Sequence, residues 1–197
     1  MLSPRLVLAS ASPGRLGLLH AAGIDPLVEV SGVDEDAVDE LDPDAMVAIL
    51  AQRKAEAVAA RRSEGLVVGA DSTLVLDGVA LGKPHTAEEA TARWRRQRGR
   101  AGVLATGHHV IDAASGRRAG AVARTAVHFA DIDDETIAAY VGTGEPLEVA
   151  GAFTLDGYGA AFVERVEGDP SNVIGLSLPL LRRLLADIGV EWRTLWR

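Results

Sequence analysis

The sequence contains no cysteine and no long apolar run. Without cysteine the chain forms neither disulfides nor thiolate metal sites and has no cysteine nucleophile, which fits a cytoplasmic protein. No apolar run reaches the roughly 18 residues that a membrane-spanning helix needs. The first apolar run, residues 6–9, is shorter than the ~7–15 residues of a signal-peptide core, so it predicts a buried strand.

Positive charge is also scarce, because 20 Lys and Arg stand against 28 Asp and Glu and leave a net charge of −8. This balance argues against nonspecific binding to nucleic acid or to a membrane. Only Lys54 and Lys83 among the basic residues are lysines. A chain that otherwise uses arginine suggests that these two positions need a compact ammonium group. Retention by chance is the alternative.

The length of 197 residues suits one sizeable domain or two small lobes that share a cleft. A hydrophobic content of 48% is enough for a packed core. No repeat, low-complexity segment or linker interrupts the chain, so we expect a single domain over residues 1–197.

The stretch from Leu66 to Pro84 places an acid and a base on one predicted hairpin. Asp71 ends the first apolar run, Asp77-Gly78 is a strong hairpin signal, and Lys83 follows the returning arm. Pairing of the arms would bring Asp71 and Lys83 into the same neighbourhood. The small residues before Asp71 suggest that something large approaches the backbone there. The alternative is an ordinary hairpin with an exposed acid and an exposed base.

A second candidate site follows the first predicted strand, where small hydroxyl residues lead into a helix. Ser12 suits the N-cap of this helix and Pro13 its first position. Free N–H groups and the helix dipole favour an anion at such a point, and Ser10 and Arg15 add a hydroxyl and a guanidinium fork. The alternative is an ordinary capped helix, since neither glycine-rich phosphate-loop pattern is present.

An acidic run over residues 34–44 leads into the next predicted helix, which starts at Asp42 and continues to about Arg62. Most of these acids are expected to be solvated, and one or two could help to hold a divalent cation. Lys54 falls on or beside the apolar stripe of this helix. Its side chain either extends along the surface to solvent or points into a cleft beneath the helix.

The rest of the chain predicts further helices and strand pairs. We expect helices over 86–98, 136–141 and 179–188, a strand over 27–30, a hairpin of 102–112 with 119–130, and a strand pair of 150–155 with 160–166. His108 and His109 alternate along one strand and cannot ligate the same metal, so they are interpreted as strand residues.

Taken in chain order, eight short blocks resemble the Maf family of nucleoside triphosphate pyrophosphatases, also called septum-formation-inhibitor-like proteins. The blocks are residues 8–13, 31–35, 54–55, 69–72, 81–84, 143–147, 150–153 and 172–176. The resemblance implies an elongated, two-lobed α/β fold, similar to ITPase, with a twisted mixed sheet and a central cleft.

The same resemblance implies hydrolysis of a nucleoside triphosphate, which could be modified or non-standard, to the monophosphate and pyrophosphate with Mg²⁺ or Mn²⁺. Such an enzyme would keep the nucleotide out of nucleic acid. Asp71 matches the general base of the family, and Lys54 and Lys83 match its motif lysines. We expect Ser10, Ser12 and Arg15 to join the lysines in binding phosphate. Glu35, with Asp71, is the candidate metal ligand.

Four positions depart from the usual family pattern: Gly14 replaces an arginine, Ser72 a threonine, Asp156 a glutamine and Gly102 a histidine. In the pyrimidine-acting branch the first three of these positions bear on base choice. An ionised aspartate only accepts hydrogen bonds, so Asp156 predicts a donor-rich base, guanine-like or cytosine-like. The alternative is that Asp156 pairs with a nearby arginine or points to solvent. A nucleotide-binding regulator of septum formation with little turnover is the alternative function, and a structural interaction protein is the third. A homodimer is left open.

Overall fold

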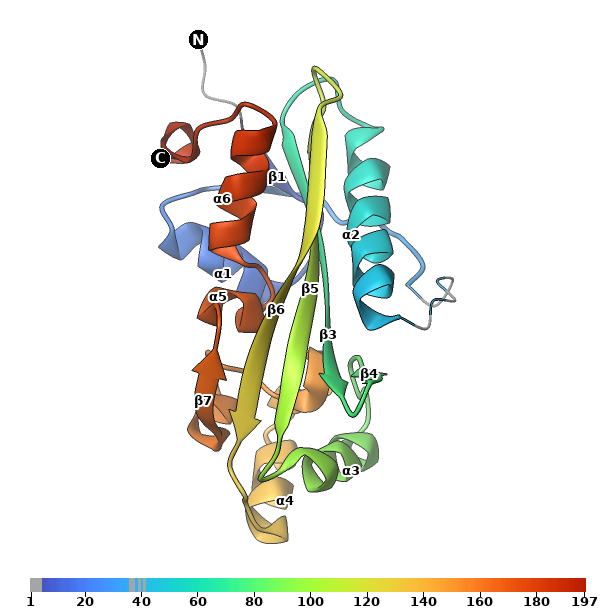
Figure 1. Ribbon diagram of the computed structural model, residues 1–197, viewed down its shortest axis with the longest axis vertical. Coiled ribbons are helices and arrows are strands. Elements are labelled where there is room, and N and C mark those ends of the chain that lie inside the picture. The colour runs from blue at the N-terminus through green and yellow to red at the C-terminus, as the bar shows by residue number, and fades with distance from the viewer. Residues whose placement is uncertain (1–4, 36–37, 39, 41) are drawn as a thin grey trace. The chain divides into compact units, whose positions relative to one another are not determined.

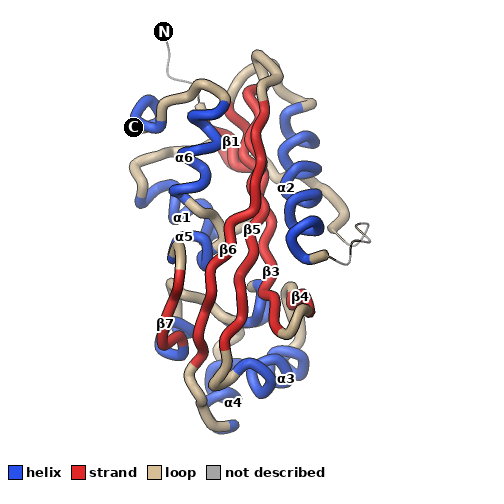
Figure 2. Tube along the Cα trace, in the orientation of Figure 1, coloured by secondary structure: helices blue, strands red, loops and turns tan. Residues whose placement is uncertain are grey.

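The computed structural model describes residues 5–35, 38, 40 and 42–197. Within these residues, one mixed seven-stranded sheet has the order β2-β1-β3-β5-β6-β7, with β4 paired to β3 (Figures 1 and 2). The strands are β1 (Leu6–Leu8), β2 (Leu27–Val28), β3 (Leu66–Leu76), β4 (Val79–Leu81), β5 (Ala101–Asp112), β6 (Arg118–Phe129) and β7 (Val163–Glu167). β1 is parallel to β2 and β3, whereas β3–β4 and β6–β7 are antiparallel. The α/β class and the mixed sheet are therefore confirmed.

The helices begin where the sequence provides caps. They are α1 (Pro13–Ala21), α2 (Pro43–Ala59), α3 (Ala87–Gln97), α4 (Asp134–Gly142), α5 (Pro170–Ile174) and α6 (Leu178–Asp187). Ser12, Asp42, Thr86, Asp133 and Ser177 accept hydrogen bonds from first-turn N–H groups. No helix within the described ranges has the length and apolar character needed to cross a bilayer.

The chain divides into two compact units. Unit 1 comprises Met1–Asp71, Thr106–Ala123 and Gly175–Arg197, and unit 2 comprises Ser72–Ala105 and Arg124–Ile174. The three long strands β3, β5 and β6 each contribute residues to both units. Each unit has a hydrophobic core of its own.

The core of unit 1 follows the alternation of its strands. Leu66, Val68 and Ala70 pack with α1 and α6, whereas Val67 packs with α2. Figure 1 shows α6 and α2 on opposite sides of the strands. Because both faces are covered, the strands consist of almost continuous apolar residues.

Two glycines allow α2 to lie directly on the sheet of unit 1. A Cβ atom at Gly69 in β3 would lie 2.7 Å from the backbone nitrogen of Ala55. A Cβ atom at Gly107 in β5 would lie 2.8 Å from the backbone nitrogen of Ala48. The large group that approaches the backbone before Asp71 is therefore helix α2.

The core of unit 2 collects most of the few aromatic side chains. Trp94 of α3 is fully buried and meets Phe129, Tyr140 and Phe162 edge to face at 5.5–5.8 Å between ring centroids. Its indole N–H donates to the carbonyl of Ala152 at 2.7 Å. This cluster fixes α3 against the irregular segment that contains Ala152.

The predicted strand pair of 150–155 with 160–166 is wrong. Only β7 is a strand there, and it pairs with β6. The preceding chain forms three 3-10 turns, η1 (Glu145–Glu148), η2 (Ala150–Ala152) and η3 (Tyr158–Phe162). Gly151 and Ala152 have φ angles of 71° and 57°, which no strand residue adopts.

Smaller differences concern element boundaries. β3 runs without interruption through Asp71, which therefore lies inside a strand rather than at its end. The helix predicted to continue to about Arg62 ends at Ala59, and the short helix α5 was not predicted. The Asp77-Gly78 turn is confirmed, with φ angles of 55° and 78° that suit a type I′ hairpin.

Candidate active site

A buried ammonium group with two carboxylates forms the centre of the candidate site in unit 1. Lys54 Nζ lies 2.6 Å from Asp71 Oδ1 and 2.6 Å from Glu35 Oε1. Lys54 is only 6% exposed and Asp71 8%, whereas Glu35 is exposed. The ammonium does not extend to solvent, so the interpretation of Lys54 as a surface-covering side chain is wrong.

The local sequence explains why these two side chains meet. Val67, Gly69 and Asp71 alternate along β3 on the face that α2 covers. Gly69 removes the side chain that would hold α2 away from the strand. Lys54 precedes Ala55, the α2 residue whose backbone lies against Gly69. Close packing at Gly69 thus places Lys54 beside Asp71.

Arg15 supplies a second buried cation in unit 1. It lies in the first turn of α1 and is 8% exposed. Its Nε donates to the carbonyl of Gly175 at 2.8 Å, and one terminal nitrogen donates to Ser10 Oγ at 3.0 Å. Burial lowers the pKa of the Arg15 guanidinium, while the negative charges of Asp71 and Glu35 act in the opposite direction. The Arg15 guanidinium therefore interacts electrostatically with both carboxylates.

The hydroxyl residues before α1 are partly used for local structure. Ser12 Oγ accepts from the backbone N–H of Arg15 at 3.4 Å, and Ser10 Oγ accepts from the N–H of Ser12 at 3.2 Å. The predicted cap is thus present. Gly14 lies half-buried in the first turn of the same helix.

The carboxylates of Asp71 and Glu35 supply two of the oxygen ligands that a divalent cation needs. Their oxygens contact the same ammonium and are the ligand type that Mg²⁺ prefers. Among the residues that the structure describes, no cluster of three or more His, Asp or Glu side chains could hold a metal ion. Mg²⁺ commonly takes one or two carboxylates and completes its shell with water and substrate phosphates. The donor set matches that pattern.

In unit 2, the backbone beside Lys83 is fastened to the turns η1 and η2. The carbonyl of Gly82 accepts from the N–H of Gly151 at 3.1 Å and from the guanidinium of Arg93. The N–H of His85 donates to the carbonyl of Leu147 at 3.0 Å. Lys83 itself is exposed.

The two other positions predicted to bear on base choice also belong to unit 2. Ser72 is half-buried in β3, directly after Asp71. Asp156 is exposed in the loop between η2 and η3. Within the described ranges, the Asp156 carboxylate has neither a hydrogen bond nor an ion pair.

Two polar residues with a role in the fold were missed from the sequence. His108, predicted only as a strand residue, bonds the carbonyl of Thr106 through Nδ1 at 3.0 Å and accepts from the N–H of Ser177 through Nε2 at 2.8 Å. It thereby ties β5 to the start of α6 in the neutral form with the proton on Nδ1. The carboxylate of Glu145 accepts four hydrogen bonds. In the sequence, this residue was marked by its place in the block of residues 143–147 that resembles the family.

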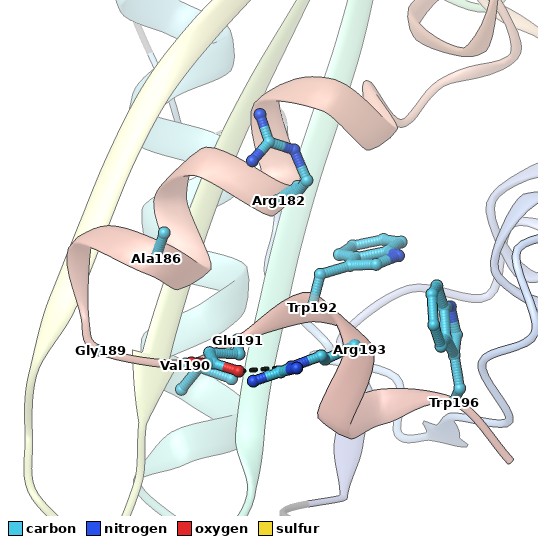
Figure 3. A pocket seen from close by; sticks show the side chains of 8 residues that line it. All are labelled: Arg182, Ala186, Gly189, Val190, Glu191, Trp192, Arg193 and Trp196. Carbon is cyan, nitrogen blue, oxygen red and sulfur yellow. Dashed lines mark hydrogen bonds and ion pairs between the residues drawn. The ribbon is translucent and has the colours of Figure 1, made fainter.

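A cavity of about 570 Å³ lies elsewhere in unit 1, between α6 and the C-terminal 3-10 turn η4 (Trp192–Leu195) (Figure 3). Trp192, Trp196 and Arg182 are among its lining residues. None of the predicted catalytic, phosphate-binding or metal-binding residues lines it.

Comparisons with known proteins show which sequences this chain resembles. The family model described as "Maf-like protein" matches residues 5–188. A protein of Streptomyces coelicolor named nucleoside triphosphate pyrophosphatase is 60% identical and covers 98% of this chain and 94% of its own length. A protein of the same name from Trichormus variabilis is 49% identical over all of both chains.

Among solved structures, the Ham1 protein of Staphylococcus aureus matches with a TM-score of 0.46 and 14% identity, over 98% of this chain and 93% of that one. The family model spans nearly the whole chain, and the two pyrophosphatase relatives match this chain over almost their full lengths. This chain belongs to the Maf-like protein family.

Proposed function

We propose that this protein is a nucleoside triphosphate pyrophosphatase, which hydrolyses a nucleoside triphosphate to the monophosphate and pyrophosphate. The observation that carries the proposal is the Lys54 ammonium, held 2.6 Å from the carboxylates of both Asp71 and Glu35 with the buried Arg15 in their field. Relatives at 60% and 49% identity carry the name of this activity.

The reaction needs a base that removes a proton from the attacking water. It also needs positive groups at fixed positions beside the phosphates. The oxygen of water forms a new bond to the α-phosphorus, the bond from that phosphorus to its bridging oxygen breaks, and pyrophosphate leaves. Asp71 takes the proton of the attacking water. The Lys54 hydrogen bond fixes the direction of the Asp71 carboxylate, so the base is oriented before substrate arrives.

The positive groups neutralise the charge that develops on the phosphate oxygens. The Lys54 ammonium has three donors, of which two meet Asp71 and Glu35. Arg15 donates to the carbonyl of Gly175 and to the hydroxyl of Ser10, and its buried guanidinium adds a second positive charge. Lys83 and the hydroxyls of Ser10 and Ser12 complete the set of proposed phosphate contacts.

A divalent cation, Mg²⁺ or Mn²⁺, would be held by Glu35 and Asp71 together with phosphate oxygens of the substrate. When bound, it would neutralise negative charge on the triphosphate and polarise the phosphoryl group. The chain's own contribution is to present two carboxylate oxygens beside the same ammonium.

The base is proposed to be donor-rich, guanine-like or cytosine-like, and either standard or modified. This rests on Asp156, whose exposed carboxylate accepts hydrogen bonds and donates none. The carbonyl-rich edges of uracil and thymine would be repelled by it. Hydrolysis of a modified nucleotide would keep it out of nucleic acid. The alternative of a regulator with little turnover is not favoured, because the relatives are named as enzymes.

The test is pyrophosphate release from a panel of nucleoside triphosphates by the wild type and by Asp71→Asn. We expect Asp71→Asn to lose about 10²–10⁴-fold in kcat, the usual worth of a positioned base. The matched control is Asp187→Asn, which changes an exposed aspartate of unit 1. Near-normal turnover in Asp71→Asn would remove Asp71 as the base. No pyrophosphate from any triphosphate with the wild type would contradict the proposed function.

A further inference from the structure

One carboxylate in unit 2, that of Glu145, accepts four hydrogen bonds. Its Oε1 accepts from Tyr140 Oη at 2.9 Å, from Thr154 Oγ1 at 2.6 Å and from the backbone N–H of Gly159 at 2.9 Å. Its Oε2 accepts from the backbone N–H of Tyr158 at 2.8 Å. So many donors on one carboxylate define both its position and that of the groups around it.

The charge state of Glu145 matches these partners. Burial acts to raise the pKa of Glu145, but the hydrogen bonds from Thr154, Gly159, Tyr158 and Tyr140 outweigh it and lower the pKa below the ordinary value. An ionised carboxylate has only acceptors, so every partner can be a donor. Burial and the Glu145 carboxylate together raise the pKa of Tyr140, which therefore keeps the proton that it donates.

Two glycines show that the loop is shaped around this carboxylate. A Cβ atom at Gly157 would lie 2.7 Å from the carboxyl carbon of Glu145. A Cβ atom at Gly159 would lie 2.7 Å from the backbone nitrogen of Thr154. A side chain at position 157 would therefore collide with the Glu145 carboxylate, and one at position 159 would collide with the backbone of Thr154 in the same loop.

The loop held in this way contains Asp156. Thr154 lies two residues before Asp156 and Tyr158 lies two residues after it, and both bind the Glu145 carboxylate. The Asp156 side chain is exposed and, among the described residues, has no partner that fixes it. The backbone on either side is thus the part of the molecule that sets where the Asp156 carboxylate lies.

We propose that Glu145 is a positioning residue for base selection, which acts by holding the 154–159 loop so that Asp156 faces the nucleobase. The inference rests on the proposed function and deepens it. Glu145 touches neither the phosphates nor the reacting water in this assignment. Its removal changes which triphosphate is preferred more than it changes the chemical step.

The experiment measures kcat/KM for guanosine, cytidine and uridine triphosphates with the wild type and Glu145→Gln. Glutamine keeps the size of the side chain but turns one acceptor into an NH₂ group that faces donors. We expect the ratio of kcat/KM between the fastest and the slowest triphosphate to fall about tenfold, the scale of one misplaced hydrogen bond to a charged group. The change should lie mainly in KM.

A double mutant separates positioning from plain stability. In an Asp156→Ala background the base preference is already lost, so adding Glu145→Gln should leave the ratio unchanged. Glu164→Gln, which changes an exposed residue of β7, is the matched control and should keep the wild-type ratio. Should Glu145→Gln not fold, Thr154→Val removes the shortest of the four bonds with little change in shape, and a smaller fall in the ratio is expected.

Each outcome supports or overturns the inference. A wild-type ratio in a folded Glu145→Gln or Thr154→Val enzyme, even with a lower melting temperature, would make Glu145 a structural residue only. The same would follow if Glu145→Gln changed the ratio equally with and without Asp156. A wild type that releases pyrophosphate from no triphosphate would instead overturn the proposed function, and the inference with it.

Discussion

Lys54 shows at the scale of a single residue why a charged side chain can lie in the interior. Its ammonium is buried between two carboxylates that compensate its loss of hydration. Asp71 in turn is almost as buried and depends on Lys54 for its nearest positive charge. Such a pair is costly to break from one side, because the partner then stays buried and unpaired.

We therefore predict that Lys54→Met lowers the free energy of unfolding by about 3 kcal/mol at neutral pH, as removal of one partner of a buried pair does. Thermal or urea denaturation measures the change. The double mutant Lys54→Met/Asp71→Asn should recover part of the loss, because no unpaired carboxylate remains.

Arg193→Met is the control for the Lys54 prediction. Arg193 pairs with Glu191 on the surface, where both side chains are mostly exposed, so its removal should change stability very little. A Lys54→Met variant as stable as the wild type would show that the buried pair contributes nothing.

At the scale of elements, the packing of α2 on β3 builds the candidate site. The sequence predicted both elements and marked the small residues before Asp71, but it did not show what approaches them. A glycine in a strand has several explanations, and only the fold shows that Gly69 makes room for the backbone of α2.

Gly69→Ala should consequently destabilise the protein by about 3 kcal/mol or more, since the added Cβ atom overlaps the backbone of α2. The control is Gly17→Ala in α1, where a Cβ atom would meet nothing within 4 Å. That substitution should stabilise by ~0.5–1 kcal/mol through helix propensity. Equal melting temperatures for the two variants would contradict the close packing of α2 on β3.

The segment from Ala150 to Val166 shows the limit of local patterns. The sequence predicted a strand pair of 150–155 with 160–166, but the structure has the 3-10 turns η2 and η3 there and only β7 as a strand. Tertiary contacts decide this conformation, because the N–H groups of Tyr158 and Gly159 bind Glu145 and the carbonyl of Ala152 binds Trp94. Residue patterns along the chain contain little trace of such long-range partners.

At the scale of the whole molecule, two hydrophobic cores share three continuous strands. The buried side chains in the core of unit 1 are all aliphatic, whereas the core of unit 2 is built around Trp94. β3, β5 and β6 contribute to both cores. Unfolding of either unit must therefore disrupt strands that the other unit needs.

We predict that both units unfold in a single cooperative transition. Tryptophan fluorescence can follow the unfolding of each unit separately. Trp94 belongs to unit 2, and Trp192 and Trp196 belong to unit 1. A Trp192→Phe/Trp196→Phe variant leaves only Trp94, and a Trp94→Phe variant leaves the other two. Within each variant, urea curves from fluorescence and from far-UV circular dichroism should coincide. Fluorescence and circular dichroism midpoints that differ within either variant would show that the units unfold separately.

The sequence by itself determined the family resemblance, the capped starts of the helices and the Asp77-Gly78 hairpin. These features follow from local patterns, because caps and tight turns are chosen by a few neighbouring residues. The tertiary structure alone decided that Lys54 is shared by Asp71 and Glu35, that Gly69 admits α2, and that Glu145 holds the Asp156 loop. Each of these depends on groups far apart in the chain, whose meeting is fixed by packing and by the need to pair buried polar groups.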